Sequence, residues 1–131
     1  MKPSQEERDQ LNHLSKILAR IHKGLFEAKM LEREKREGTV LGPGARLQLL
    51  IHDEEFAWLR PLSQLMTAVD DVYFQKEPIS IEQMSSLKSE IKDLLIEMKK
   101  AEFAVPFSGI CKTLPGVVLE HGNLVAALRG S

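Results

Sequence analysis

An uninterrupted seam of aliphatic side chains in the first third of the chain is the feature that most constrains the fold. Its members recur at spacings of three and four residues, and nothing breaks the pattern before Gly38, a natural C-terminal stop. Ser4 and Glu7 have the spacing of a capping box and place the helix start. The sequence therefore predicts one helix over residues 5–37, roughly 50 Å long at 1.5 Å per residue. Its seam consists of Leu11, Leu14, Leu18, Ile21, Leu25 and Ala28.

A second helical stretch of similar length is predicted over residues 43–75, after a turn at 38–42. Pro43 suits a first helical position, where its missing N–H costs nothing. Asp53 can cap a new helix, and Pro61 inside a continuous helix would kink it, so we expect a break or bend between residues 53 and 61. The buried face should contain Trp58, Pro61, Leu62, Leu65, Met66, Val69 and Tyr73.

Three residues near the predicted break are read as structural anchors. Trp58 is the only tryptophan and is expected to be a core residue, while Pro61 sets the bend. We expect the Arg60 guanidinium to pair with Asp53 or Glu55 and to fix the bend, in preference to clamping an acidic partner or stacking on the indole.

Two more helices are predicted in the second half of the chain. Ser80 and Gln83 repeat the capping-box signal, and an apolar seam follows that predicts a helix over residues 81–102. Residues 114–129 have a seam at Leu114, Val118, His121, Val125 and Leu128, which favours a helix. The alternative there is a hairpin that turns at Gly122 and Asn123.

Short connections between long helices favour antiparallel neighbours, so the predicted fold is an all-α, up-and-down four-helix bundle in a single domain, residues 1–131. Eighteen basic and nineteen acidic residues give a net charge of −1, which argues against nucleic-acid binding. Apolar runs are too short to span a membrane. A single cysteine, Cys111, and the lack of a recognisable leader favour the cytoplasm.

The predicted third helix is too short to cover one end of the bundle, and large apolar side chains there need a partner. Either the 103–113 segment folds over this end or a second subunit does, and we favour a homodimer. The predicted contact region consists of Phe26, Met30, Leu31, Ile96 and Phe103.

Di-iron bundles require Glu-x-x-His pairs on helices, a pattern against which the four histidines can be judged. The residues three positions before the histidines are Gln10, Ala19, Leu49 and Val118, so the motif is absent. No metal ligand or other cofactor is therefore predicted. A small-ligand or metal-binding bundle of hemerythrin-like architecture stays as the alternative, with His22, His52 or His121 at an internal cavity.

The other residues that could take part in a reaction give only weak signals in the sequence. Cys111 has no neighbouring cysteine or evident activating group. The run of alternating charges over residues 32–37 is typical of a solvated helix end. No catalytic residue is predicted, because no nucleophile and base, and no carboxylate pair, can be placed together from spacing alone.

Residues 56–63, Phe-Ala-Trp-Leu-Arg-Pro-Leu-Ser, resemble a segment shared by short bacterial helical proteins. The resemblance covers about 30 residues well, from Gly42 to Asp70, and the C-terminal Leu-Pro-Gly-Val-Val-Leu-Glu-His-Gly is a weaker second match. It implies a bacterial, soluble, helical protein and carries no activity or functional residue. The sequence thus favours a non-enzymatic protein that acts through protein contacts.

Overall fold

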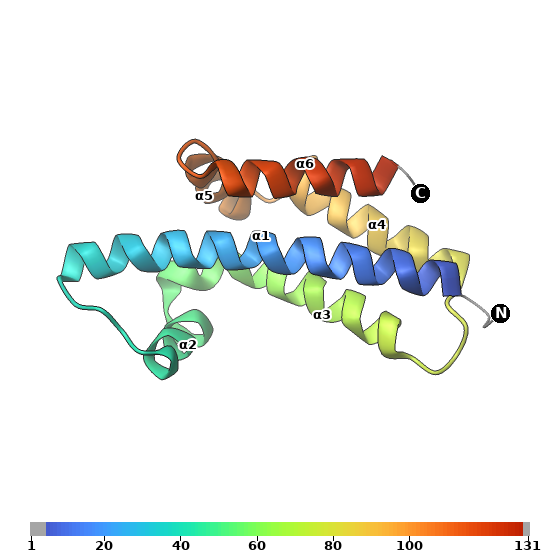
Figure 1. Ribbon diagram of the computed structural model, residues 1–131, viewed down its shortest axis with the longest axis horizontal. Coiled ribbons are helices and arrows are strands. Elements are labelled where there is room, and N and C mark those ends of the chain that lie inside the picture. Colours follow the sequence, from blue (N-terminus) through green and yellow to red (C-terminus); the bar gives the residue numbers. More distant parts are fainter. Residues whose placement is uncertain (1–4, 130–131) are drawn as a thin grey trace.

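The computed structural model describes residues 5–129, and within this range the chain is helical with no strand (Figure 1). Six α-helices and one 3₁₀ helix follow one another, more elements than the four predicted. They are α1 (Gln5–Glu37), α2 (Pro43–His52), η1 (Glu54–Leu59), α3 (Arg60–Phe74), α4 (Ile81–Leu95), α5 (Ala101–Cys111) and α6 (Pro115–Arg129). The all-α class is confirmed. The additional elements come from the break in the 43–75 stretch and from α5, which forms mainly in the 103–113 segment between the last two predicted helices.

Helix α1 has the predicted bounds and forms the central element, packed against α3 and α6 (Figure 1). The leucines and the isoleucine of its seam are at most 2% exposed and Ala28 is partly buried, as expected for a helix covered along one face. Gly38 ends it with a φ of 72°, a left-handed conformation that glycine adopts without a steric penalty. Ser4, the first half of the predicted capping box, lies outside the described residues.

The predicted break between residues 53 and 61 is confirmed. The Asp53 carboxylate accepts a hydrogen bond from the Glu55 amide at 2.8 Å and caps η1. Pro61 lies in the first turn of α3, so its missing N–H interrupts no helical hydrogen bond. The proline therefore starts a helix here and does not kink one.

The predicted helix over residues 81–102 is wrong at its C-terminal end. The Ser80–Gln83 capping box is present, but α4 ends at Leu95 and α5 begins at Ala101. Met98, three residues beyond the end of α4, has a φ of 53°, a left-handed conformation at a position that no glycine or proline marks. The Lys92 carbonyl accepts hydrogen bonds from the Ile96 and Glu97 amides. This carbonyl in the last turn of α4 is therefore hydrogen-bonded although no capping residue marks the helix end in the sequence.

Residues 115–129 form helix α6, so the helical prediction is confirmed over the hairpin. The buried face is rotated from the predicted one: Val117 and Leu124 are buried, whereas Val118 is 50% exposed. The cause lies on α1, where Gly24 presents no side chain and admits Val117. Three of the helices, α1, α3 and α6, lie roughly side by side in Figure 1, and α4 packs against α3.

Helix α5 covers the apolar end that the sequence analysis left open. Phe103, Phe107 and Ile110 are buried, and α5 packs against η1, α6, α1 and α4. The Phe103 ring lies 5.8 Å from the Trp58 ring and 5.5 Å from the Phe107 ring, measured between centroids. The chain's own segment thus buries these aromatic side chains.

Candidate protein-contact surface

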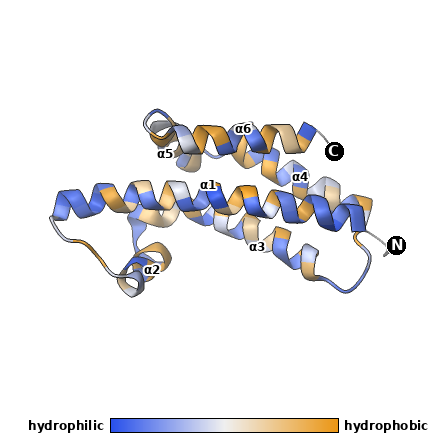
Figure 2. Ribbon diagram, viewed as in Figure 1, coloured by the Kyte–Doolittle hydropathy of each residue, from blue (hydrophilic) through white to orange (hydrophobic). Residues whose placement is uncertain are grey.

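Helix α2 is unusual among the helices because none of its described residues is buried. It stands away from the helical body at one end of the molecule (Figure 1), and its ribbon is partly hydrophobic there (Figure 2). Leu47 is 53% exposed and Ile51 is 48% exposed, one helical turn apart on its outer side. Leu49 and Leu50 are half-buried against the core. We call this helix the arm.

The start of the arm is held by Glu34 of α1. One carboxylate oxygen accepts a hydrogen bond from the Leu41 amide at 2.7 Å, and the other pairs with the Arg46 guanidinium at 2.9 Å. The Leu41 amide and Arg46 hold the pKa of the Glu34 carboxyl below its usual range, although burial opposes the shift. Glu34 is 7% exposed, the one charged residue among those described that is classed as buried.

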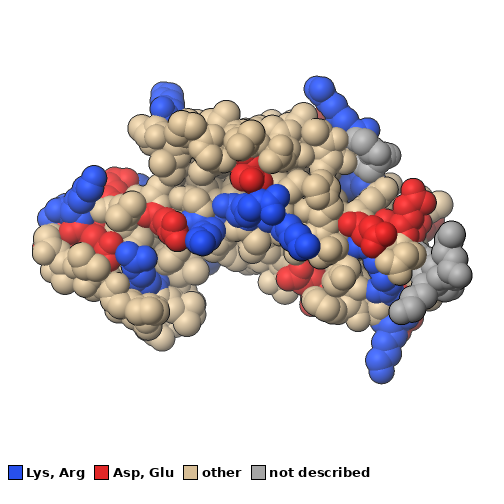
Figure 3. Space-filling model, in the orientation of Figure 1, with Lys and Arg blue, Asp and Glu red and all other residues tan. Residues whose placement is uncertain are grey.

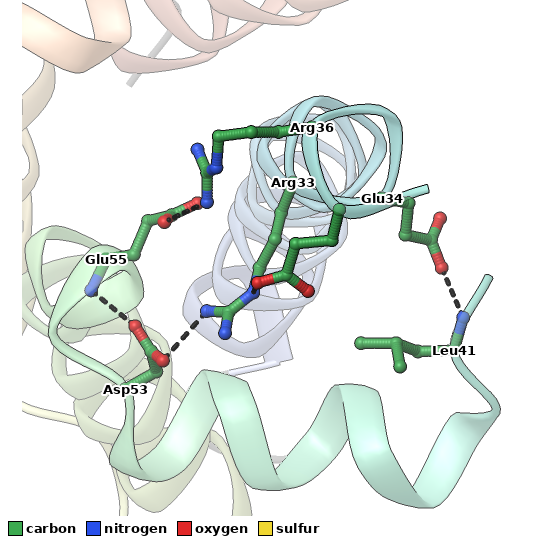
Figure 4. A network of polar contacts seen from close by, with 7 residues as sticks. Arg33, Glu34, Arg36, Leu41, Asp53 and Glu55 are labelled. Carbon is green, nitrogen blue, oxygen red and sulfur yellow. Dashed lines mark hydrogen bonds and ion pairs between the residues drawn. The ribbon is translucent and has the colours of Figure 1, made fainter. Parts of the chain in front are cut away.

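The end of the arm is held by two arginines of α1 (Figure 4). Arg33 pairs with Asp53 at 2.8 Å, and Arg36 pairs with Glu55 at 2.8 Å. The Arg33 hydrogen bond lowers the pKa of the Asp53 carboxyl, and the same bond raises the pKa of Arg33. We call these contacts, together with those of Glu34, the clasp.

The clasp corrects two predictions. The charged run at residues 32–37 is not merely a solvated helix end, because Arg33, Glu34 and Arg36 bind groups outside α1. Arg60 does not pair with Asp53 or Glu55 in the structure, because α1 supplies their partners. Its guanidinium donates to the Ile51 carbonyl at 3.0 Å and so caps the last turn of the arm.

The clasp predicts that acid loosens the arm. A carboxylate whose pKa is lowered by folding stabilises the folded state above its unfolded pKa, and that stability is lost as the pH falls through the folded pKa. We expect the urea-unfolding free energy to fall on going from neutral pH to about pH 3, and to fall less in a Glu34→Gln variant. Glu37→Gln is the matched control, because the Glu37 side chain is 45% exposed and pairs with Arg33 of its own helix, not with a group of the arm. An equal pH dependence in wild type and Glu34→Gln would contradict this role.

The predicted contact residues do not form one surface. Met30 and Phe103 are fully buried, and Phe26 is half-buried with its ring 5.5 Å from that of Phe56 in η1. Leu31 is 54% exposed and Ile96 is 36% exposed. The second apolar face of α1 is thus covered at Phe26 by η1, a partner that appears only when the second helix breaks.

The side chains of Trp58, His22 and His121 pack or bond within the fold. Trp58 is 8% exposed, as predicted. His22 Nε2 lies 3.0 Å from the Ser63 hydroxyl, and burial lowers the pKa of this histidine. His121 Nε2 lies 2.7 Å from the Leu95 carbonyl, with its ring against Phe107. His13 and His52 are exposed.

Chemically reactive groups are not gathered in one place. Within residues 5–129, no three side chains among His, Cys, Asp and Glu are close enough together to hold a metal ion. Burial raises the pKa of the Cys111 thiol, which disfavours the thiolate. No helix in the described part of the chain is long and apolar enough to cross a bilayer.

A groove of about 630 Å³ lies between α3 and α4. Apolar side chains from both helices line it, with charged groups of α4 and of the following turn along one wall. This groove could not be predicted from the sequence, because the distance between two helices is not encoded in the apolar pattern of either one. On the face shown in Figure 3, charged side chains follow α1, while the surface over α5 and α6 is mostly uncharged.

Comparisons with known proteins leave the chain without a family. No protein-family model and no solved structure matches it. Nonribosomal peptide synthetase valB from Aspergillus terreus is 30% identical over 95 residues, which are 69% of this chain and 4% of the synthetase. The chain thus spans a small fraction of the length of this relative.

Proposed function

We propose that the protein is a non-enzymatic bundle that acts through protein–protein contacts, as a homodimer, with the arm as its contact surface. In this proposal α1, α3, α4 and α6 form a four-helix body that carries the arm. The supporting observation is that α2 buries none of its residues and yet exposes Leu47 and Ile51. An apolar helix side that its own chain leaves uncovered is a typical site for a partner.

The clasp supports the same proposal. Ion pairs and hydrogen bonds from α1 hold both ends of the arm, so it is ordered before a partner arrives. A preordered contact helix loses less conformational entropy on binding than a flexible one. The arm therefore has both an apolar outer side and a fixed position.

The similarity to nonribosomal peptide synthetase valB is compatible with this function. The matched stretch is 4% of that protein, so a unit of this kind would act there beside a much larger chain. A contact role suits such a small unit better than a complete reaction. Bacterial origin and a cytoplasmic location stay predictions of the sequence analysis.

Sedimentation equilibrium tests the proposal with one paired substitution and one matched control. We expect wild type to be a dimer and Leu47→Asp with Ile51→Asp to be a monomer of unchanged helix content, because a charge on each side chain opposes desolvation of the arm. Phe74→Asp with Ile81→Asp should remain dimeric, since these exposed side chains, 75% and 78% accessible, lie at the last residue of α3 and the first residue of α4, outside the arm. A monomeric wild type, or a dimer that persists unchanged in the arm variant, would refute the dimer.

Small-ligand binding is a second candidate function, and the α3–α4 groove favours it. Its volume, about 630 Å³, lies within the range of about 300 to 1,000 Å³ that is typical of ligand pockets. Metal content measured on the same purified sample examines the metal-binding form of this candidate. Stoichiometric metal would support that form and would direct attention to His22, His52 and His121, none of which lines the groove.

A further inference from the structure

The firmly packed part of the molecule ends at Asp53, where the arm meets η1. Three of the six residues of η1 are buried, all of them large and apolar, whereas none of the described residues of α2 is buried. The apolar contacts of the arm with the core come from Leu49 and Leu50, which are half-buried. Because apolar burial dominates local stability, the arm should open at a much lower free-energy cost than η1.

The clasp holds the arm mainly through charge (Figure 4). The Arg36 side chain is half-exposed and the Arg46 side chain is partly exposed, so water and salt reach both of their ion pairs. Accessible ion pairs each contribute little to stability, and dissolved salt weakens them further. The attachment of the arm should therefore weaken as the ionic strength rises.

A detached arm is too short to remain helical. It has 10 residues, and isolated helices shorter than about 12 to 15 residues are marginal in water. Gly44, its second residue, lowers its helix propensity further. Loss of the clasp is therefore expected to unravel α2, and not to move it as a rigid helix.

The chain on either side of the arm allows it to detach without disturbing the helical body. Residues 39–42, which precede it, form neither helix nor strand. On the other side, one oxygen of the Asp53 carboxylate accepts from the Glu55 amide and the other accepts from Arg33, so η1 keeps its cap when the ion pair is lost. The opening can therefore end at these two points, with α1 still packed against α3 and α6.

We infer that the arm is a separate unit of unfolding that the clasp keeps folded. When the ion pairs of the clasp are weakened, α2 detaches and unravels while η1 and the helical body stay folded. This opening is a property of the single chain and goes beyond the proposed function. One consequence rests on the proposed function: a helical contact surface exists only while the clasp is closed, so high salt would weaken the dimer.

Hydrogen exchange followed by mass spectrometry tests the opening. Wild type is diluted until sedimentation shows a monomer, so that a second copy does not cover the arm. In about 0.01 M NaCl we expect the amides of residues 46–52 to be protected at least about a hundredfold less than the most protected amides of α1, a difference of about 2.7 kcal/mol. An increase to about 1 M NaCl shortens the Debye length from about 30 Å to about 3 Å. It should lower the protection of the arm at least about threefold further and leave that of α1 unchanged.

A paired substitution tests the clasp itself. Arg36→Gln with Arg46→Gln removes one ion pair at each end of the arm. We expect at least about threefold less protection of residues 46–52 at low salt, a smaller salt effect than in wild type, and unchanged protection of α3. Arg20→Gln with Lys29→Gln is the matched control, because it removes the same number of charges from two ion pairs outside the clasp. The control should leave the protection of the arm unchanged.

The outcomes separate the inference from the proposed function. Exchange of the arm amides as slow as that of the α1 interior would show that the arm opens only with the whole protein, and would overturn the inference. Arm protection that is insensitive to salt, or equal in the paired variant and its control, would show that the clasp does not hold the arm, and would overturn it as well. A salt-sensitive arm in a wild type that is monomeric at every concentration would support the inference and refute the homodimer.

Discussion

Replacement of Trp58 by alanine is expected to lower the free energy of unfolding by about 3 to 5 kcal/mol. The indole is 92% covered and packs against the Phe103 ring of α5 and within the main core. Its loss would leave a cavity where η1, α5 and the body meet. Urea unfolding followed by circular dichroism measures the change, since the variant lacks the only tryptophan.

Trp58→Phe is the matched control for this prediction. It keeps one aromatic ring and removes the indole Nε1, which is buried without a hydrogen-bond partner in the described structure. We expect less than half of the cost of the alanine variant. Equal costs for the two variants would show that the contribution of Trp58 does not come from filling this space.

Replacement of Gly24 by leucine is expected to destabilise the protein by about 1 to 3 kcal/mol. A Cβ atom at Gly24 would lie 2.9 Å from Val117 Cγ2, so a side chain there must push α6 away from α1. The ion pair between Arg20 and Glu120, 2.9 Å long, joins the same two helices and would be disturbed with it. Thermal unfolding and urea unfolding both report the effect.

Gly122→Ala in α6 is expected to have the opposite effect and to stabilise the protein. A Cβ atom at Gly122 meets nothing within 4 Å, so the substitution gains helix propensity at no steric cost. We expect up to about 1 kcal/mol of stabilisation. Destabilisation by both substitutions, to the same extent, would indicate that the close approach at Gly24 has no special role.

The sequence correctly predicted those helix ends that are marked by a capping residue or by a glycine. Gly38 ends α1 and Ser80 begins α4 where the sequence places them, because turn and cap chemistry involve only neighbouring residues. The end of α4 was missed, since Met98 adopts a left-handed conformation that its residue type does not announce. The conformation at Met98 depends on the tertiary contacts of the helices before and after it.

The contact surface was less accessible to sequence reasoning than the helices. The predicted contact region included no residue of the arm, and Met30 and Phe103, which were expected at an interface, are buried. The clasp was hidden because Glu34 and Arg46 are 12 residues apart and meet only when the chain folds back after Gly38. Spacing within one helix gives the buried face, whereas contacts between helices decide which apolar side chains remain outside.

The order of the helices along the chain has a consequence for biosynthesis. Helix α1 is the first described element, yet α6, the last one, packs against it at Gly24 and Arg20. At roughly 5 to 20 residues per second, a ribosome completes α6 several seconds after α1 has been made. During that interval the α6-facing side of the nascent helix has no native cover.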